Sequence, residues 1–180
     1  AQRAYEAKNY ARARELVTSL LAAKPAPAMR ENALYLSGQI SVAEEKWDES
    51  RPTFETLVRE SPQSKNRPMF EFGIAEAIFR QGDYPASEER FRRLLQQPQG
   101  PDPSWPAVVR LRLAQTLCHQ EKWKDAYPIA SQIEKEFPGT FYVLAREPRF
   151  LHHSEVLVLA RRPDAPVSRT AGRAPERRGQ

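Results

Sequence analysis

The sequence has 180 residues, the length of one domain with room for a tail, and its single cysteine, Cys118, excludes an intrachain disulfide. Glycine is scarce at 7 residues, which argues against a β-sandwich with tight turns, and no stretch reaches the roughly 18 consecutive apolar residues of a membrane-spanning helix. The net charge is +5, but residues 146–180 alone hold eight arginines against four acidic residues, so the rest of the chain is nearly neutral.

The first residues of the chain read as the inside of a helix. Residues 1–5 include neither a start methionine nor an apolar signal core. We therefore expect a first helix that ends near residue 7 and a chain that is a piece of a longer protein. The sequence allows either the bacterial periplasm or cell envelope, or the cytoplasm, as the compartment of the protein.

An aromatic residue followed three positions later by alanine or serine occurs four times. The aromatic residues are spaced 37, 37 and 39 positions apart, and they are Tyr10, Trp47, Tyr84 and Trp123. Apolar residues then occupy the positions seven and ten after each aromatic, which are Val17 and Leu20, Phe54 and Leu57, Phe91 and Leu94, and Ala130 and Ile133. Positions three, seven and ten share one face of a helix with 3.6 residues per turn, so each aromatic begins an amphipathic helix.

The repeat predicts a series of helical hairpins. In chain order, the predicted helices are 1–7, 10–23, 29–45, 48–60, 67–81, 84–97, 104–120 and 123–136. Gly82 and Asp83, like the equivalent pairs in the other repeats, mark the turn inside a hairpin. A proline near the end of each second helix terminates it. Pro52 and Pro128 lie about one turn into their helices, where we expect mild distortion rather than a break.

This spacing of small, aromatic and proline residues resembles the tetratricopeptide repeat, whose usual period is about 34 residues. Linkers such as residues 61–64 and 137–140 are similar to those of bacterial cell-envelope members, of the Tol–Pal coordinator and outer-membrane assembly lipoprotein types. The resemblance implies an all-α fold, an α-solenoid of about three and a half hairpins. It covers about residues 1–140, and we assign 1–145 to the repeat domain.

In this family the first helix of each hairpin lines the concave side of the solenoid, and that side binds a peptide or a partner protein. The resemblance places the following candidate partner-binding residues there: Tyr35, Gln39, Phe72, Glu76, Phe79, Arg80, Arg112 and Gln115. The competing interpretation is that about half of this face packs against neighbouring helices. Some members clamp a peptide carboxylate with lysine and asparagine, but the equivalent positions here are Tyr35, Gln39, Met69 and Gly73, so that function is not carried over.

No residue pattern indicates an enzyme. His152 and His153 are adjacent, so on a helix they point about 100° apart and are poorly placed to share a metal. Cys118 next to His119 is more simply a small buried residue than a nucleophile, because neighbours in a helix face different ways. Nucleotide-binding and hydrolase motifs are absent from the sequence. We therefore expect no catalytic residue, no metal and no cofactor, and no small-molecule substrate.

The last part of the chain departs from the repeat. The apolar run at residues 156–160 suggests either a capping helix over 146–162 or a strand-like stretch without a partner. Residues 163–180 are rich in Pro, Ala, Gly and Arg and predict a disordered basic tail, because they contain too few apolar side chains to bury. Two alternatives to peptide binding stay open: this tail could bind nucleic acid or an anionic membrane surface, or the repeats could be a structural spacer in a longer array.

Overall fold

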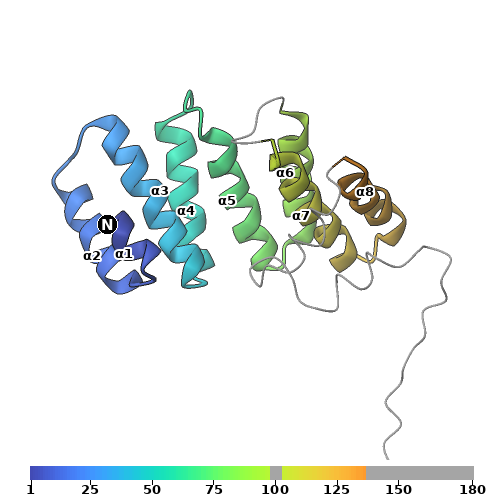
Figure 1. The fold of residues 1–180 in the computed structure, drawn as a ribbon, viewed down its shortest axis with the longest axis horizontal. Helices are drawn as coiled ribbons and strands as arrows, with labels where there is room; N and C mark the ends of the chain where they lie inside the picture. The colour runs from blue at the N-terminus through green and yellow to red at the C-terminus, as the bar shows by residue number, and fades with distance from the viewer. Residues whose placement is uncertain (98–102, 137–180) are drawn as a thin grey trace, which may run out of the picture.

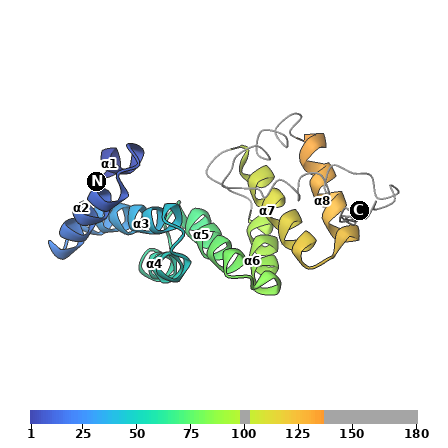
Figure 2. The same ribbon diagram turned by 90° about the horizontal axis from the view of Figure 1, so that it is seen from below.

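A computed structural model describes residues 1–97 and 103–136, and within them all regular structure is helical (Figure 1). The helices are α1 (Gln2–Glu6), α2 (Tyr10–Ala22), α3 (Pro27–Ala43), α4 (Trp47–Glu60), α5 (Arg67–Arg80), α6 (Tyr84–Gln96), α7 (Trp105–His119) and α8 (Trp123–Glu136). They follow one another along the long axis of the molecule (Figures 1 and 2). The prediction of an all-α solenoid of hairpins is confirmed.

Every helix begins and ends within two residues of the range expected from the sequence. The agreement has a local cause, since prolines occupy the first turn of α3, α5, α6 and α7, where the missing N–H has no helical partner to lose. Pro52 and Pro128 lie inside α4 and α8, and neither breaks its helix. The predicted capping helix over 146–162 and the basic tail over 163–180 lie outside the described residues.

The turn inside each hairpin has the same backbone geometry in all four repeats. The residue two positions before each repeat aromatic has a positive φ, and these residues are Lys8 (58°), Glu45 (57°), Gly82 (86°) and Glu121 (58°). The next amide then bonds back to a carbonyl five residues earlier, as Lys46 does to Ser41 at 2.8 Å and Asp83 to Ile78 at 3.2 Å. This is the Schellman ending of a helix, which satisfies the last carbonyls and reverses the chain.

Consecutive hairpins pack through the second-helix residue that lies seven after the aromatic. In α4 this residue is Phe54, which is buried, and its ring lies against Gly38 of α3 and Gly73 of α5. A Cβ atom added at either glycine would lie 2.6–2.8 Å from the ring of Phe54. The two glycines therefore allow three helices to converge on one aromatic side chain.

The core is divided among the hairpins rather than gathered at one centre. Buried residues form three clusters, the first joining α2 and α3, the second α4 and α5, and the third α5 to α8. The main contacts run between consecutive helices, and α3 also touches α5. This nearest-neighbour arrangement is the organisation of a repeat solenoid.

Candidate functional site

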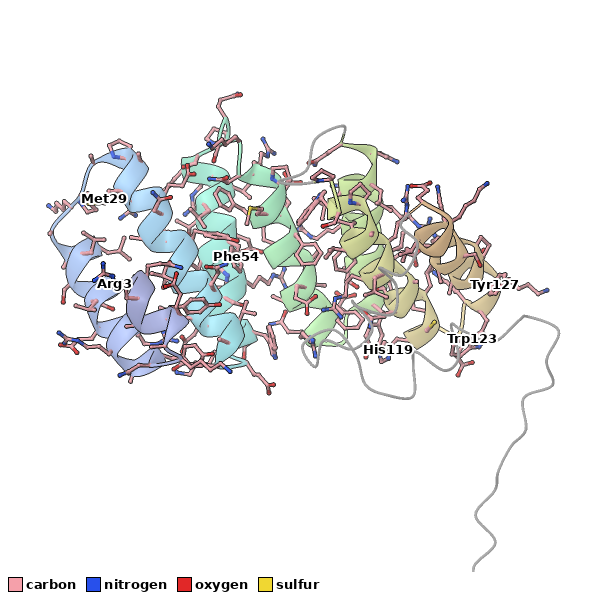
Figure 3. All side chains as sticks on the ribbon, in the orientation of Figure 1. Arg3, Met29, Phe54, His119, Trp123 and Tyr127 are labelled. Atoms are coloured by element: carbon pink, nitrogen blue, oxygen red, sulfur yellow. The ribbon has the colours of Figure 1, made fainter. Side chains whose placement is uncertain are left out.

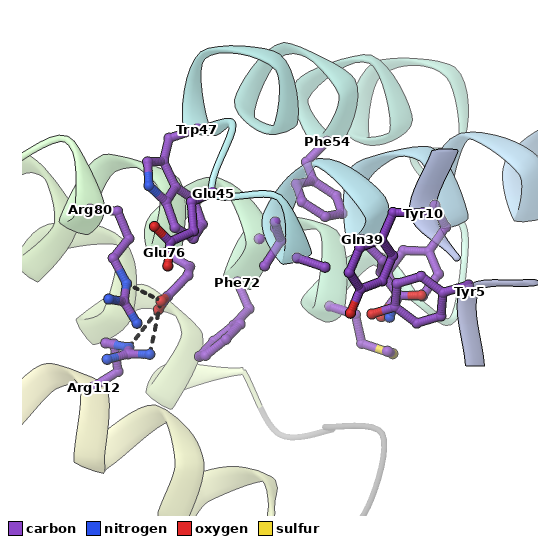
Figure 4. Close-up of a pocket in the computed structure, with 15 residues that line it drawn as sticks. Tyr5, Tyr10, Gln39, Glu45, Trp47, Phe54, Phe72, Glu76, Arg80 and Arg112 are labelled. Carbon is purple, nitrogen blue, oxygen red and sulfur yellow. Dashed lines mark hydrogen bonds and ion pairs between the residues drawn. The ribbon is translucent and has the colours of Figure 1, made fainter. Parts of the chain in front are cut away.

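A groove of about 470 Å³ crosses the described helices from α1 to α7 (Figure 4). Side chains from α1, α2, α3, α4, α5 and α7 line it, together with Glu45 in the turn before α4. Because every described hairpin supplies at least one of these residues, the groove exists only when the repeats are stacked.

Tyrosines dominate the end of the groove nearest the N-terminus. Tyr5 and Tyr10 pack with ring centroids 5.8 Å apart. The ring centroid of Tyr35 lies 5.7 Å from that of Phe70 and 6.2 Å from that of Phe54. Burial raises the pKa of Tyr35 above its ordinary value, so its hydroxyl stays protonated at neutral pH. This end therefore offers aromatic faces with hydroxyl groups at their edges, which suits apolar side chains and backbone polar groups of a ligand.

A charged cluster forms the opposite end. Glu76 accepts a hydrogen bond from Arg80 Nε at 2.9 Å and another from Arg112 Nη2 at 2.8 Å (Figure 4). Arg112 and Glu76 are nearly buried, with 2% and 7% of their surface exposed, whereas the side chain of Arg80 is 28% exposed. The guanidinium of Arg80 also lies 5.5 Å from the ring centre of Trp47. The cluster joins helices α5 and α7 and presents Arg80 to the groove.

The structure brings most of the sequence-predicted site residues together. Tyr35, Gln39, Phe72, Glu76, Arg80 and Arg112 line the groove. Phe79 and Gln115 lie beneath its wall instead, with 7% and 0% of their surface exposed. The guanidinium carbon of Arg112 lies 5.0 Å from the ring centroid of Phe79, and Arg112 Nη1 donates a hydrogen bond to Gln115 Oε1 at 2.7 Å. These two residues therefore support the charged cluster from below.

Sequence reasoning missed several residues of the groove. Tyr5, Tyr10, Trp47 and Phe54 line it although none belongs to the first helix of a complete hairpin. Two of them are repeat aromatics at the starts of second helices, where the turn brings them to the same side as the first helices. The recurrence of an aromatic residue at the positions of Tyr10 and Trp47 was the sequence signal that could have indicated these two residues.

The positions equivalent to a carboxylate clamp are in the groove but lack its chemistry. Tyr35, Gln39, Met69 and Gly73 all line the groove, and none of them is a lysine or an asparagine. The cationic side chains that line the groove are Arg80, seven residues beyond Gly73 in α5, and Arg112 in α7. A ligand carboxylate would therefore meet a different set of donors from those of the clamp.

The other candidate centres carry little chemistry in the described part of the chain. Cys118 is buried, with 5% of its surface exposed, as expected for a small core residue. No three His, Cys, Asp or Glu side chains come together there as a metal site would require. His152 and His153 lie outside the described residues. Among the described helices none has the length and apolar character to cross a membrane.

Part of the sequence matches a model of a known protein family. The family model described as the tetratricopeptide repeat matches residues 1–65 and, in a second overlapping register, residues 35–103. No curated protein matches the sequence. The two matched ranges cover more than half of the chain and include helices α1 to α6, whose hairpins and turns have the geometry described above. This chain belongs to the tetratricopeptide repeat family.

Proposed function

We propose that this chain is a protein–protein interaction scaffold that binds an extended segment of a partner protein in the groove. The observation that carries the proposal is the groove itself, which runs across stacked repeats from α1 to α7 and has aromatic walls. Stacked repeats form extended concave surfaces of this kind, and tetratricopeptide repeats generally mediate protein–protein interactions. The proposal includes no catalytic step and no cofactor.

The lining of the groove suits a peptide better than a small polar molecule. Large aromatic side chains supply most of the binding energy at protein interfaces, and Tyr35 and Phe72 present such surfaces here. Gln39 can donate and accept hydrogen bonds with a peptide backbone, and Arg80 can bind an acidic side chain. An extended peptide can use both ends of the groove at once, with an apolar residue among the tyrosines and a polar residue near Arg80.

The test begins with peptides selected against the full chain from a random displayed library. Binding of the selected peptides is then measured for wild type, Gln39→Arg and Arg80→Gln. We expect Arg80→Gln to weaken binding about tenfold or more, since a hydrogen bond to a charged group contributes about 1.5–3 kcal/mol. We expect Gln39→Arg to weaken binding as well, because it removes the amide and puts a larger, charged side chain in the groove. Arg93→Gln is the matched control, because Arg93 is on α6 outside the groove, with a side chain 67% exposed. Equal binding by all four proteins would refute the groove as the binding site.

The basic tail defines a second candidate, binding to nucleic acid or to an anionic membrane surface. The eight arginines in residues 146–180 motivate it. Binding of this kind weakens steeply with added salt and is lost when residues 161–180 are deleted, whereas groove binding survives the deletion. If neither the deletion nor the groove variants changes any interaction, the repeats act as a structural spacer.

We also propose that the protein belongs among the bacterial cell-envelope members of the family. The linkers at residues 61–64 and 137–140 support this subgroup. Fractionation of cells that express the full-length protein tests it. Recovery with the periplasmic or membrane fraction is the expected result, and recovery with cytoplasmic markers alone would contradict it.

A further inference from the structure

The tyrosine end of the groove has no charged side chain in its lining. The charged residues that line the groove are Glu45, Glu76, Arg80 and Arg112. Figure 4 shows all four at the charged end, with Phe54 and Phe72 between them and the tyrosines. A charged ligand residue among the tyrosines would lose its water without gaining an ion pair with a lining residue, which costs free energy. The charge pattern of the lining is therefore complementary to an uncharged segment of the ligand.

The tyrosine end combines exposed ring faces with hydrogen-bond donors. Tyr5, Tyr10 and Tyr35 come from helices α1, α2 and α3, and all three are partly exposed. The rings of Tyr5 and Tyr10 are tilted by 51°, so their faces do not cover each other. Figure 4 shows Gln39 next to these two tyrosines. A tyrosine hydroxyl and a glutamine amide can each donate a hydrogen bond, so this end can hold apolar rings and carbonyl groups together.

A run of prolines matches this combination. Proline is uncharged, has an apolar ring and lacks a backbone N–H, so its main chain offers carbonyl acceptors only. Its fixed φ also preforms the extended polyproline II helix, whose carbonyls make no internal hydrogen bonds. Grooves lined with aromatic side chains recognise this conformation in several kinds of binding domain. An α-helix matches less well, because its own amides already occupy its carbonyls.

We propose that the tyrosine end of the groove selects an uncharged, proline-rich segment of the partner, bound as a polyproline II helix. The inference rests on the proposed function, since it takes the groove as the binding site, and it adds the class of sequence that binds. Proline rings pack on the faces of Tyr5, Tyr10 and Tyr35. The tyrosine hydroxyls and the amide of Gln39 donate hydrogen bonds to the carbonyls of the segment.

Decaproline is the direct probe of this end of the groove. Fluorescence anisotropy measures binding of labelled decaproline to the full chain, next to an uncharged peptide of the same length and label that alternates alanine and serine. We expect decaproline to bind roughly tenfold more tightly, because a preformed helix loses less conformational freedom on binding. Equal binding of the two peptides overturns the proposal.

Tyr5→Leu locates the bound decaproline. The variant removes one ring face and should weaken binding roughly threefold to tenfold, whereas Tyr5→Phe keeps the ring and should weaken it less. Helix α1 buries no residue, so we expect both variants to fold, and circular dichroism checks this. Tyr127→Leu is the matched control, since Tyr127 lies on α8 outside the groove lining, at the C-terminal end of the described helices (Figure 3). Equal binding by Tyr5→Leu and Tyr127→Leu overturns the inference.

Peptides selected from the random library separate failure of this inference from failure of the groove. The inference expects prolines to be enriched in them and unlabelled decaproline to displace them. Suppose the selected peptides lose affinity for Gln39→Arg and Arg80→Gln, yet contain no excess of proline and resist displacement. The groove is then the binding site and only the present inference is overturned. If neither these peptides nor decaproline responds to any groove variant, both proposals are wrong.

Discussion

Gly82 and three charged residues occupy the same left-handed position in the four hairpin turns. For Lys8, Glu45 and Glu121 the φ values are 57–58°, a conformation that L-residues with a Cβ atom adopt at some cost in energy. Glycine adopts it freely, and only one of the four turns has glycine. Three of the turns therefore carry a small strain that the hairpin packing offsets.

Exchanging the residue types at these turns should change the free energy of unfolding in opposite directions. Gly82→Ala should lower it by about 1 kcal/mol, and Glu121→Gly should raise it by about 0.5 kcal/mol. A Cβ at Gly82 would meet no atom within 4 Å, so packing does not contribute to the first effect. Urea unfolding measures both variants, and a neutral Gly82→Ala would show that the turn tolerates a side chain without strain.

At the scale of helices, the convergence on Phe54 sets how closely α3, α4 and α5 approach. Gly73→Ala tests it, because two effects of opposite sign compete. Alanine favours a helix over glycine by about 1 kcal/mol, but its Cβ would lie 2.6 Å from the buried ring of Phe54. Overpacking of a core usually costs about 1–3 kcal/mol, so we expect a net loss of stability.

A double-mutant cycle identifies the ring as the cause of that loss. In a Phe54→Leu background the side chain at position 54 is smaller, and Gly73→Ala should then be less harmful than in the wild type. Thermal unfolding of the four proteins gives the coupling free energy. Additive effects would mean that the clash with Phe54 does not limit the approach of the helices.

Glu88 connects α6 to the turn before α8 and makes the stability of that junction depend on pH. It accepts hydrogen bonds from Lys122 Nζ, Arg92 Nε and Gln120 Nε2, each at 2.8 Å. Burial alone would raise the pKa of Glu88, but these hydrogen bonds outweigh it, and the pKa lies below its ordinary value. The ionised form is therefore favoured more in the folded protein than in the unfolded chain.

The sign of the pH effect follows from this depressed pKa. The stabilisation by Glu88 is complete above the pKa of an unfolded glutamate, about 4.3, and is lost as the pH falls through the lower folded value. Glu88→Gln should reduce stability at pH 7 and flatten its decline below about pH 4.3. Glu89→Gln, on the exposed side of α6, is the control in urea unfolding across this pH range. Identical acid profiles for both variants would contradict the assignment.

For the whole molecule, the division of the core into clusters predicts that the two ends unfold separately. Ile133 is fully buried in the cluster of α5 to α8, and Val17 is buried in the cluster of α2 and α3. Ile133→Ala removes three buried carbon atoms and should cost about 2–5 kcal/mol locally. In a one-dimensional stack the loss reaches the neighbouring repeat first and fades with distance.

Hydrogen exchange measures that distance dependence directly. Ile133→Ala should speed exchange in α7 and α8 and leave α2 and α3 unchanged, while Val17→Ala should give the reverse pattern. Each variant is thus the control for the other. Equal acceleration in all helices would show that the described repeats unfold as one cooperative unit.

The helix ranges were predictable because their signals are local. A repeat aromatic, a small residue three positions later and a proline beyond the helix recur at nearly constant spacing, and each acts within a few residues of its own position.

The groove was predictable only in part. The sequence assigned both Phe79 and Tyr35 to the concave side. In the structure Tyr35 lines the groove, whereas the guanidinium of Arg112 covers the ring of Phe79. Helical periodicity indicates a face, but not how much of it a neighbouring helix covers.

The sequence by itself determined the order of helices, the four hairpin turns and the family, since short-range sterics and hydrophobic periodicity specify them. The tertiary structure decided which side chains meet across hairpins. Glu76 and Arg112 are 36 residues apart and join only because the stacking of hairpins brings α5 and α7 within reach of each other's side chains at the charged end of the groove. Such contacts depend on the distance and crossing angle between helices, which result from the packing of whole helix faces. No local pattern in the chain encodes them.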